Sequence, residues 1–193
     1  MIGFVMHFID VVLATILLLI SSLFSQVEVN EDILKYNQYI GQEAIEPYRV
    51  KSSMDEEIFP KSITDNMKVE DYKMVYYNPW DAQYLSYLVV NYDEPDYEAE
   101  VNRLKSYNST EYIGYYGVTG FSKYELLAMS ANDYNGFIYA LTDGKGKIIY
   151  VELIFCNYYY DLDYSKYINA DYLPDGFDAT VDNAYRKEKL GED

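Results

Sequence analysis

Histidine is almost missing from this chain of 193 residues, since the single one, His7, lies within an apolar N-terminal segment. A Ser-His-Asp triad, a Cys-His pair and a zinc site with histidine ligands all require an imidazole. The sequence therefore argues against these chemistries in any body that follows residue 25. The only cysteine, Cys156, cannot form an internal disulfide, so packing must hold the fold together. We expect Cys156 to be a small buried residue of a strand.

Basic residues are also scarce, with 15 Lys and Arg against 32 Asp and Glu and a formal net charge of −17. Nucleic acids are bound through clusters of Lys and Arg, so this composition argues against a nucleic-acid partner. The same charge opposes adsorption of the body to an anionic bilayer surface. Cationic partners and cell-wall-like polymers stay open as ligands.

Motifs for nucleotides and for calcium are missing too. The Gly-Lys-Gly-Lys sequence at 144–147 lacks the spacing of a phosphate-binding loop and leads into a predicted strand, not a helix. The acidic segment from Asp161 fails as an EF-hand loop, because Lys166 replaces the required glycine and Tyr172 the bidentate Glu. We therefore expect no cofactor. An irregular calcium site stays open, with ligands drawn from four acidic residues: Asp161, Asp163, Asp171 and Asp175.

Residues 1–25 are the most apolar part of the chain, and the run Val11 to Ile20 has only Thr15 as a polar interruption. A spanning helix needs about 20 apolar residues, and the core of a signal peptide needs about 7 to 15. The first ten residues carry no Lys or Arg, and Leu23 stands where a cleavage site needs a small side chain. We favour an uncleaved transmembrane anchor. Cleavage near Ser25 and secretion is the alternative, and a buried helix of a soluble protein is a third reading.

The flanking charges set the expected orientation in the membrane. Positive residues favour the cytoplasmic side, and the first basic residue of this chain is Lys35, within a strongly acidic body. We therefore predict a single-pass protein of the cell membrane that contacts the bilayer through residues 1–25 and has its body outside the cytoplasm.

The composition divides the chain into four segments, of which residues 1–25 are the apolar leader. After the leader, residues 26–66 are mixed and polar and predict a stalk with short helices, the first running from Asn30 as its cap to Gly41. Residues 67–182 are rich in Tyr, Val, Ile and Leu separated by turn residues, and predict an α+β ectodomain. Residues 183–193 form a charged tail that we expect to fray.

Alternating apolar runs within 67–182 predict the strands. They are residues 69–77 and 83–92 joined by a turn at 78–81, then 112–118, 126–130, 137–142 and 147–158. Asp93 opens a helix whose apolar stripe is Tyr97, Val101 and Leu104. Both faces of residues 147–158 are mostly apolar, which predicts a central strand. The expected fold class is α+β, with an N-terminal membrane helix followed by a mainly antiparallel five- or six-stranded sheet packed on one principal helix.

Tyrosine is in excess, with 25 residues that all follow the leader. Tyrosine offers a rigid amphipathic contact surface, so aromatic residues beside acids predict a binding surface for a protein or polymer ligand. Its candidate residues are Trp80, Tyr158, Tyr159, Asp161 and Asp163. The plainer interpretation is that most tyrosines are strand formers whose hydroxyls reach the surface.

One acidic residue stands apart, because Glu152 lies among apolar residues in the middle of a predicted strand. Burial there would raise the pKa of Glu152, although its face could simply be the wetter one. We predict no catalytic residue and interpret the chain as a non-catalytic binding module. The alternatives are a small carboxylate-dependent hydrolase of the cell envelope and a purely structural envelope component.

Overall fold

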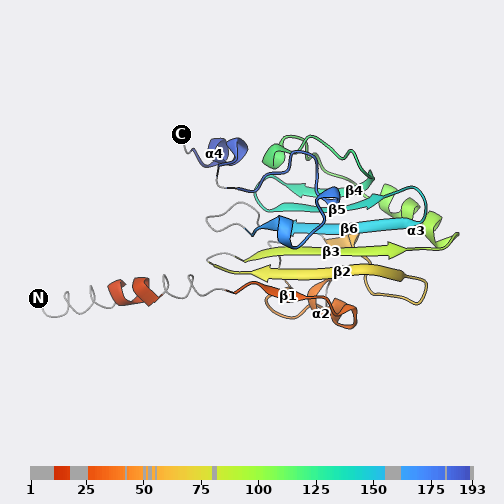
Figure 1. Cartoon of the computed structure of the whole chain (residues 1–193), viewed down its shortest axis with the longest axis horizontal. Coiled ribbons are helices and arrows are strands. Elements are labelled where there is room, and N and C mark those ends of the chain that lie inside the picture. The colour runs from red at the N-terminus through yellow and green to blue at the C-terminus, as the bar shows by residue number, and fades with distance from the viewer. Residues whose placement is uncertain are drawn as a thin grey trace, which may run out of the picture.

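The computed structural model describes residues 11–17, 26–41, 43–49, 51, 54, 56–79, 82–154, 162–180 and 182–191. Its centre is a six-stranded antiparallel sheet in the order β1-β2-β3-β6-β5-β4 (Figure 1). The strands are β1 (Glu28–Asn30), β2 (Lys68–Tyr77), β3 (Gln83–Asn91), β4 (Glu125–Asn132), β5 (Gly136–Thr142) and β6 (Lys147–Ile154). The predicted α+β class and the hairpins β2-β3 and β5-β6 are confirmed.

Short helices surround the sheet. The α-helices after residue 26 are α2 (Tyr36–Tyr39), α3 (Asp96–Lys105) and α4 (Ala184–Leu190). The 3-10 turns are η1 (Ile33–Lys35), η2 (Glu56–Ile58), η3 (Tyr115–Gly117), η4 (Tyr164–Lys166) and η5 (Ala170–Tyr172). Helix α3 begins after Pro95 rather than at Asp93, whose carboxylate instead binds the ammonium of Lys68.

Strand β6 pairs with β3 on one side and β5 on the other, so it is central as predicted. Because side chains alternate along a strand, its even-numbered residues point to one face of the sheet and its odd-numbered residues to the other. Ile148, Tyr150 and Ile154 lie in one apolar cluster, while Val151 and Leu153 lie in another. The sheet therefore has two buried faces.

Residues 26–66 cover the first of these faces together with α3, which differs from the predicted polar stalk. They supply β1, which pairs with β2, and they bury apolar side chains against the sheet, among them Tyr36, Ile40, Tyr48 and Phe59. The sequence of this segment does not reveal its packing, because its apolar residues are spread among charged ones without a regular period. No helix or strand pattern therefore marks the buried side. The short helix is present, but Asp32 and not Asn30 caps its first turn.

The second face is covered by residues from the region 112–124 and from the region 162–185. We predicted a strand at 112–118, and this is wrong: the segment forms η3 instead. Gly114 and Gly117 have positive φ angles and interrupt the extended backbone, and Tyr116 packs on Phe137. The charged tail contains α4, whose Tyr185 ring contacts Tyr116.

The predicted membrane helix is only partly within the described residues. Residues 11–17 are helical (Figure 1), and the remaining residues of the predicted segment 1–25 lie outside the described residues. Among the residues that the structure describes, no helix combines the length and the apolar character that a membrane span needs.

Candidate functional site

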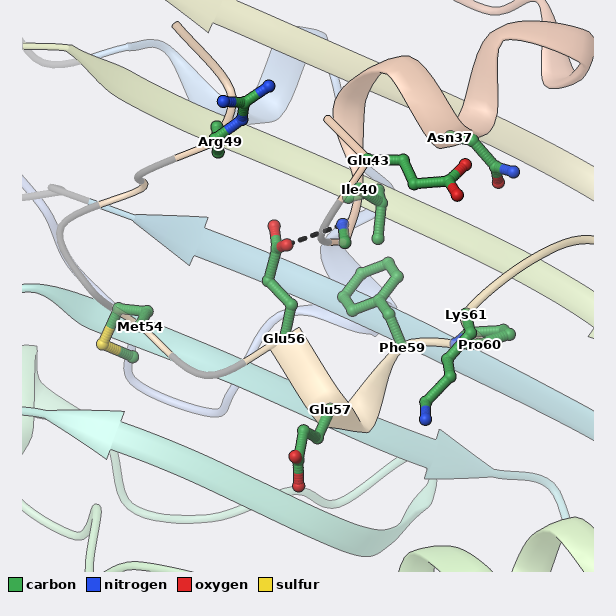
Figure 2. Close-up of a pocket in the computed structure, with 11 residues that line it drawn as sticks. Asn37, Ile40, Glu43, Arg49, Met54, Glu56, Glu57, Phe59, Pro60 and Lys61 are labelled. Atoms are coloured by element: carbon green, nitrogen blue, oxygen red, sulfur yellow. Dashed lines mark hydrogen bonds between the residues drawn. The ribbon is translucent and has the colours of Figure 1, made fainter. Parts of the chain in front are cut away.

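A pocket of 450 Å³ opens on the first face, between the end of α2 and η2. Its apolar surface comes from Ile40, Met54, Phe59 and Pro60. Its polar surface comes from Asn37, Gly41, Glu43, Arg49, Glu56, Glu57 and Lys61. The volume lies within the usual range for small-ligand sites, which is about 300 to 1,000 Å³. Figure 2 shows Glu56 and Phe59 side by side at the centre of this arrangement.

The wall formed by η2 is fixed from two sides. Arg103 of α3 donates hydrogen bonds from its guanidinium to the carbonyl oxygens of Glu57 and Ile58, both at 2.8 Å. The Tyr36 hydroxyl, from α2, donates to the carbonyl oxygen of Pro60 at 2.6 Å. These contacts hold a segment that has only one helical turn of its own, so the pocket wall is set by tertiary contacts.

Glu56 joins the pocket to the interior of the protein. Its Oε2 accepts a hydrogen bond from the Gly41 backbone N–H at 2.7 Å, which is the dashed line in Figure 2. Its Oε1 lies 2.7 Å from the Lys51 Nζ, close enough for an ion pair. The geometry of that contact does not meet the requirements of a hydrogen bond, and Oε1 is buried without another partner in the described part of the chain.

Lys51 also forms an ion pair with Glu152, in the middle of β6. Its Nζ donates to Glu152 Oε1 at 2.8 Å, and the hydroxyl of Ser86 on β3 donates to the same oxygen at 2.6 Å. The Lys51 side chain is 1% exposed and the Glu152 side chain 0%. Glu152 Oε2 has no hydrogen-bond partner among the described residues. The protein thus buries two carboxylates around one ammonium group.

The environment of Glu152 opposes its ionisation. Burial raises the pKa of Glu152, and Lys51 counteracts this by stabilising the carboxylate, while the negative charge of Glu56 raises the pKa further. A cluster of one cation and two anions carries a net negative charge, so proton uptake relieves it. Glu152 is fully buried, so it does not lie on a solvent-exposed face of the strand.

Aromatic rings enclose this cluster. The Lys51 Nζ lies 5.8 Å from the centroid of the Tyr84 ring, within the range of a cation–π contact. The Tyr84 hydroxyl donates to the carbonyl oxygen of Pro47 at 2.9 Å. Tyr48 packs edge-on against Tyr84 and covers the same region. These rings therefore pack beside the buried pair of Lys51 and Glu152.

The residues predicted as a binding surface do not contribute to this pocket. Trp80, Tyr158, Tyr159 and Asp161 lie outside the described residues. Asp163 is described and lies beside a second pocket, of 460 Å³, on the other face of the sheet. Its carboxylate accepts a hydrogen bond from the Ser165 hydroxyl at 2.6 Å and pairs with Lys166 at 3.1 Å. Mainly through the Ser165 hydrogen bond, its pKa is lowered.

The structure describes three of the four acidic residues considered for calcium, namely Asp163, Asp171 and Asp175. Within the described ranges, no group of three or more Asp, Glu, His or Cys side chains is close enough to share a metal ion. Asp175 accepts a hydrogen bond from Ser122, and Asp171 lies 3.9 Å from Lys123. Asp161 lies outside the described residues.

Sequence reasoning singled out Glu152 but missed Lys51 and Glu56. The hydrogen bond between Lys51 and Glu152 joins residues 101 positions apart, so no local pattern links them. Glu56 sits in a run of acids that resembles any exposed polar segment. The only available signal was Glu152 itself, because an acid in a central strand requires a partner from elsewhere.

Comparisons of the chain with protein-family models, with curated proteins and with solved structures found no match.

Proposed function

We propose that this protein is a non-catalytic binding module, anchored in the cell membrane through residues 1–25, whose pocket beside Glu56 takes a ligand with an ammonium group on an apolar stem. A lysine side chain has this chemistry. The observation that carries the proposal is the position of Glu56, whose carboxylate is fixed by Gly41 and Lys51 at the wall of an otherwise partly apolar pocket.

The geometry of Glu56 suits an incoming ammonium group. A carboxylate oxygen can accept two hydrogen bonds, and Oε2 of Glu56 accepts one, from Gly41. The side chain of Glu56 is 15% exposed, so it forms the wall of the pocket without being free in solvent. Because its position is already fixed, a ligand does not have to order it.

Charge favours a cation over an anion at this site. Three glutamates line the pocket with one arginine and one lysine, and the whole chain carries a formal net charge of −17. Such a field raises the local concentration of cations and repels anions. The apolar residues Ile40, Met54 and Phe59 provide the contact surface for the stem of the ligand.

The buried acid does not favour the hydrolase alternative. A general acid must lie within hydrogen-bond reach of the bond that it protonates. Glu152 is 0% exposed and is hydrogen-bonded to Lys51 and Ser86, and it does not line the pocket. Its contacts suit a structural ion pair better than an acid that meets a substrate.

A matched set of small probes tests the ligand class. We expect 2-phenylethylamine to bind the full-length chain about fivefold more tightly than 2-phenylethanol, and 3-phenylpropionate to bind most weakly, because an added ion pair contributes about 1 kcal/mol. Binding is measured by chemical-shift changes in the NMR spectrum at pH 8. Glu56→Gln should abolish the preference for the amine, whereas Glu98→Gln, on the exposed side of α3, should keep it. Equal binding of amine and alcohol would overturn the proposed ligand class.

The membrane placement is supported by the apolar run from Val11 and by the helical conformation of residues 11–17, whose Leu13 and Leu17 side chains are more than half exposed. An exposed apolar helix of this kind gains free energy by entering lipid. Proteolysis of intact cells followed by fractionation tests this placement. We expect the body to be digested and the leader to stay with the membrane. A body protected from protease, or a fully soluble protein, would contradict it.

A further inference from the structure

We propose that Glu152 is a buried proton switch that sets how strongly the Glu56 wall of the pocket attracts a cationic ligand. The inference rests on the proposed function, since it concerns the regulation of the same site. It follows from one arrangement: Lys51 lies between Glu152, which is sealed inside the protein, and Glu56, which borders the pocket.

The two contacts of the Lys51 ammonium define the starting state of the proposed switch. Lys51 Nζ lies 2.8 Å from Glu152 Oε1 and 2.7 Å from Glu56 Oε1, so one ammonium group is shared by two carboxylates. With Glu152 ionised, its negative charge neutralises the Lys51 ammonium. The charge of Glu56 is then left to act on the pocket, and a cationic ligand meets its full attraction.

Protonation of Glu152 changes this balance. The Lys51 ammonium is then neutralised by Glu56 alone, and Nζ can reorient to donate to Glu56 Oε1. Oε2 of Glu152, which has no partner among the described residues, provides a place for the proton. A ligand ammonium now competes with Lys51 for the same carboxylate, so its affinity falls as the pH falls.

Few other titratable groups face Glu152. Lys51 and Glu56 come from the segment that covers the sheet. Tyr36 of α2, Tyr72 of β2 and Tyr84 of β3 also interact electrostatically with Glu152, and burial raises the pKa of each tyrosine, so all three stay neutral at physiological pH. These three tyrosines therefore do not change the charge of the cluster at physiological pH. Burial raises the pKa of Glu152, and the ammonium of Lys51 counteracts this.

The first measurement needs no ligand. The carboxyl carbons of ¹³C-labelled glutamate in the full-length chain, held in neutral detergent micelles, are followed by NMR from pH 4 to pH 9. Glu56→Gln and Glu152→Gln spectra assign the two signals. We expect Glu152 to titrate above the exposed glutamates and the Glu56 signal to shift in the same pH range. A Glu56 signal that does not respond, or a Glu152 that keeps one protonation state throughout, overturns the switch.

The second measurement follows the affinity for 2-phenylethylamine from pH 8 to the acid side of the Glu152 titration. We expect a decrease of about fivefold, the lower end of typical coupling between two sites. Glu152→Gln, which is neutral at every pH, should remove this dependence and bind as weakly as the protonated wild type. Glu98→Gln should retain the wild-type pH profile. In both variants, circular dichroism verifies the fold.

The outcomes separate the two proposals. Amine binding that does not change with pH overturns the switch and leaves the proposed function standing. Amine binding no tighter than that of the alcohol at pH 8 overturns the proposed function, and the carboxyl signals of Glu56 and Glu152 then decide the switch independently.

Discussion

The two faces of the sheet are both buried, but only one of them buries charge. The first face lies under residues 33–63 and α3. Among the described residues, the only buried charged side chains are those of Lys51 and Glu152, and both lie on this face. The face under η3 to η5 is packed with aromatic and aliphatic side chains, and its buried polar residues are the neutral Gln83 and Asn183. The central strand β6 contributes to both faces, because Glu152 points to the first face while its neighbours Val151 and Leu153 point to the second.

This difference bears on the proposed binding site, which lies on the face that buries the ion pair. Burying an ion pair seldom adds stability over an apolar pair of the same volume, so a buried pair beside a pocket points to a role other than packing. On both faces, neutral tyrosine hydroxyls hold the covering segments by hydrogen bonds to backbone carbonyl oxygens. Tyr36 donates to Pro60 on the first face, and Tyr139 donates to the carbonyl oxygen of Tyr172 on the second at 2.8 Å.

The largest effect is expected from breaking the buried pair. Lys51→Met leaves the buried Glu152 carboxyl without its cationic partner and should lower the free energy of unfolding by about 4 kcal/mol, measured by urea denaturation at pH 8. The double variant Lys51→Met/Glu152→Leu makes the first face resemble the second and should restore most of this loss. Lys145→Met, at the exposed β5-β6 turn, is the matched control and should change stability by less than about 0.5 kcal/mol. A single variant as stable as the control would show that the pair is not buried as described.

A truncation on the apolar face should have the next largest effect. Leu153 is fully buried, and Leu153→Ala should lower the free energy of unfolding by about 3 kcal/mol, because it removes apolar contacts and leaves a cavity. The loss should be the same at pH 5 and pH 8, since no titratable group is removed. A strong pH dependence of this loss would mean that the two faces are coupled through β6.

The two anchoring tyrosines allow a matched comparison of the faces. Tyr36→Phe and Tyr139→Phe each remove one hydrogen bond to a backbone carbonyl and should each cost about 1 kcal/mol. Thermal unfolding of the two variants measures both losses under the same conditions. A much greater loss for Tyr36→Phe would indicate that the pocket wall depends on this single contact.

The smallest effect is expected at an exposed ion pair. Lys68 and Asp93 are bonded at 2.6 Å, but their side chains are 63% and 73% exposed. Asp93→Asn should therefore change the free energy of unfolding by only about 0.5 kcal/mol, and added salt should reduce the difference. A loss comparable with that of Lys51→Met would contradict the argument that burial makes the difference.

Much of the sheet was predictable from local patterns. Strands β2, β3 and β5 begin and end within a few residues of their expected bounds, because regular alternation and turn residues mark them. Strand β6 begins at the expected residue, and its expected end at residue 158 lies outside the described residues. Residues 112–118 were mistaken for a strand, since tyrosines that pack on the sheet have the same composition as tyrosines within it. The candidate site was not predictable beyond Glu152, because its other members come from distant segments.

The sequence by itself determined the α+β class, the central position of β6 and the exclusion of imidazole chemistry from the body. These properties depend on composition and on the period of side chains along one strand. Only the tertiary structure decided that residues 26–66 cover the sheet and that Lys51 and Glu56 meet Glu152. The physical reason is that a buried charge specifies the need for a partner, but not where along the chain the partner lies.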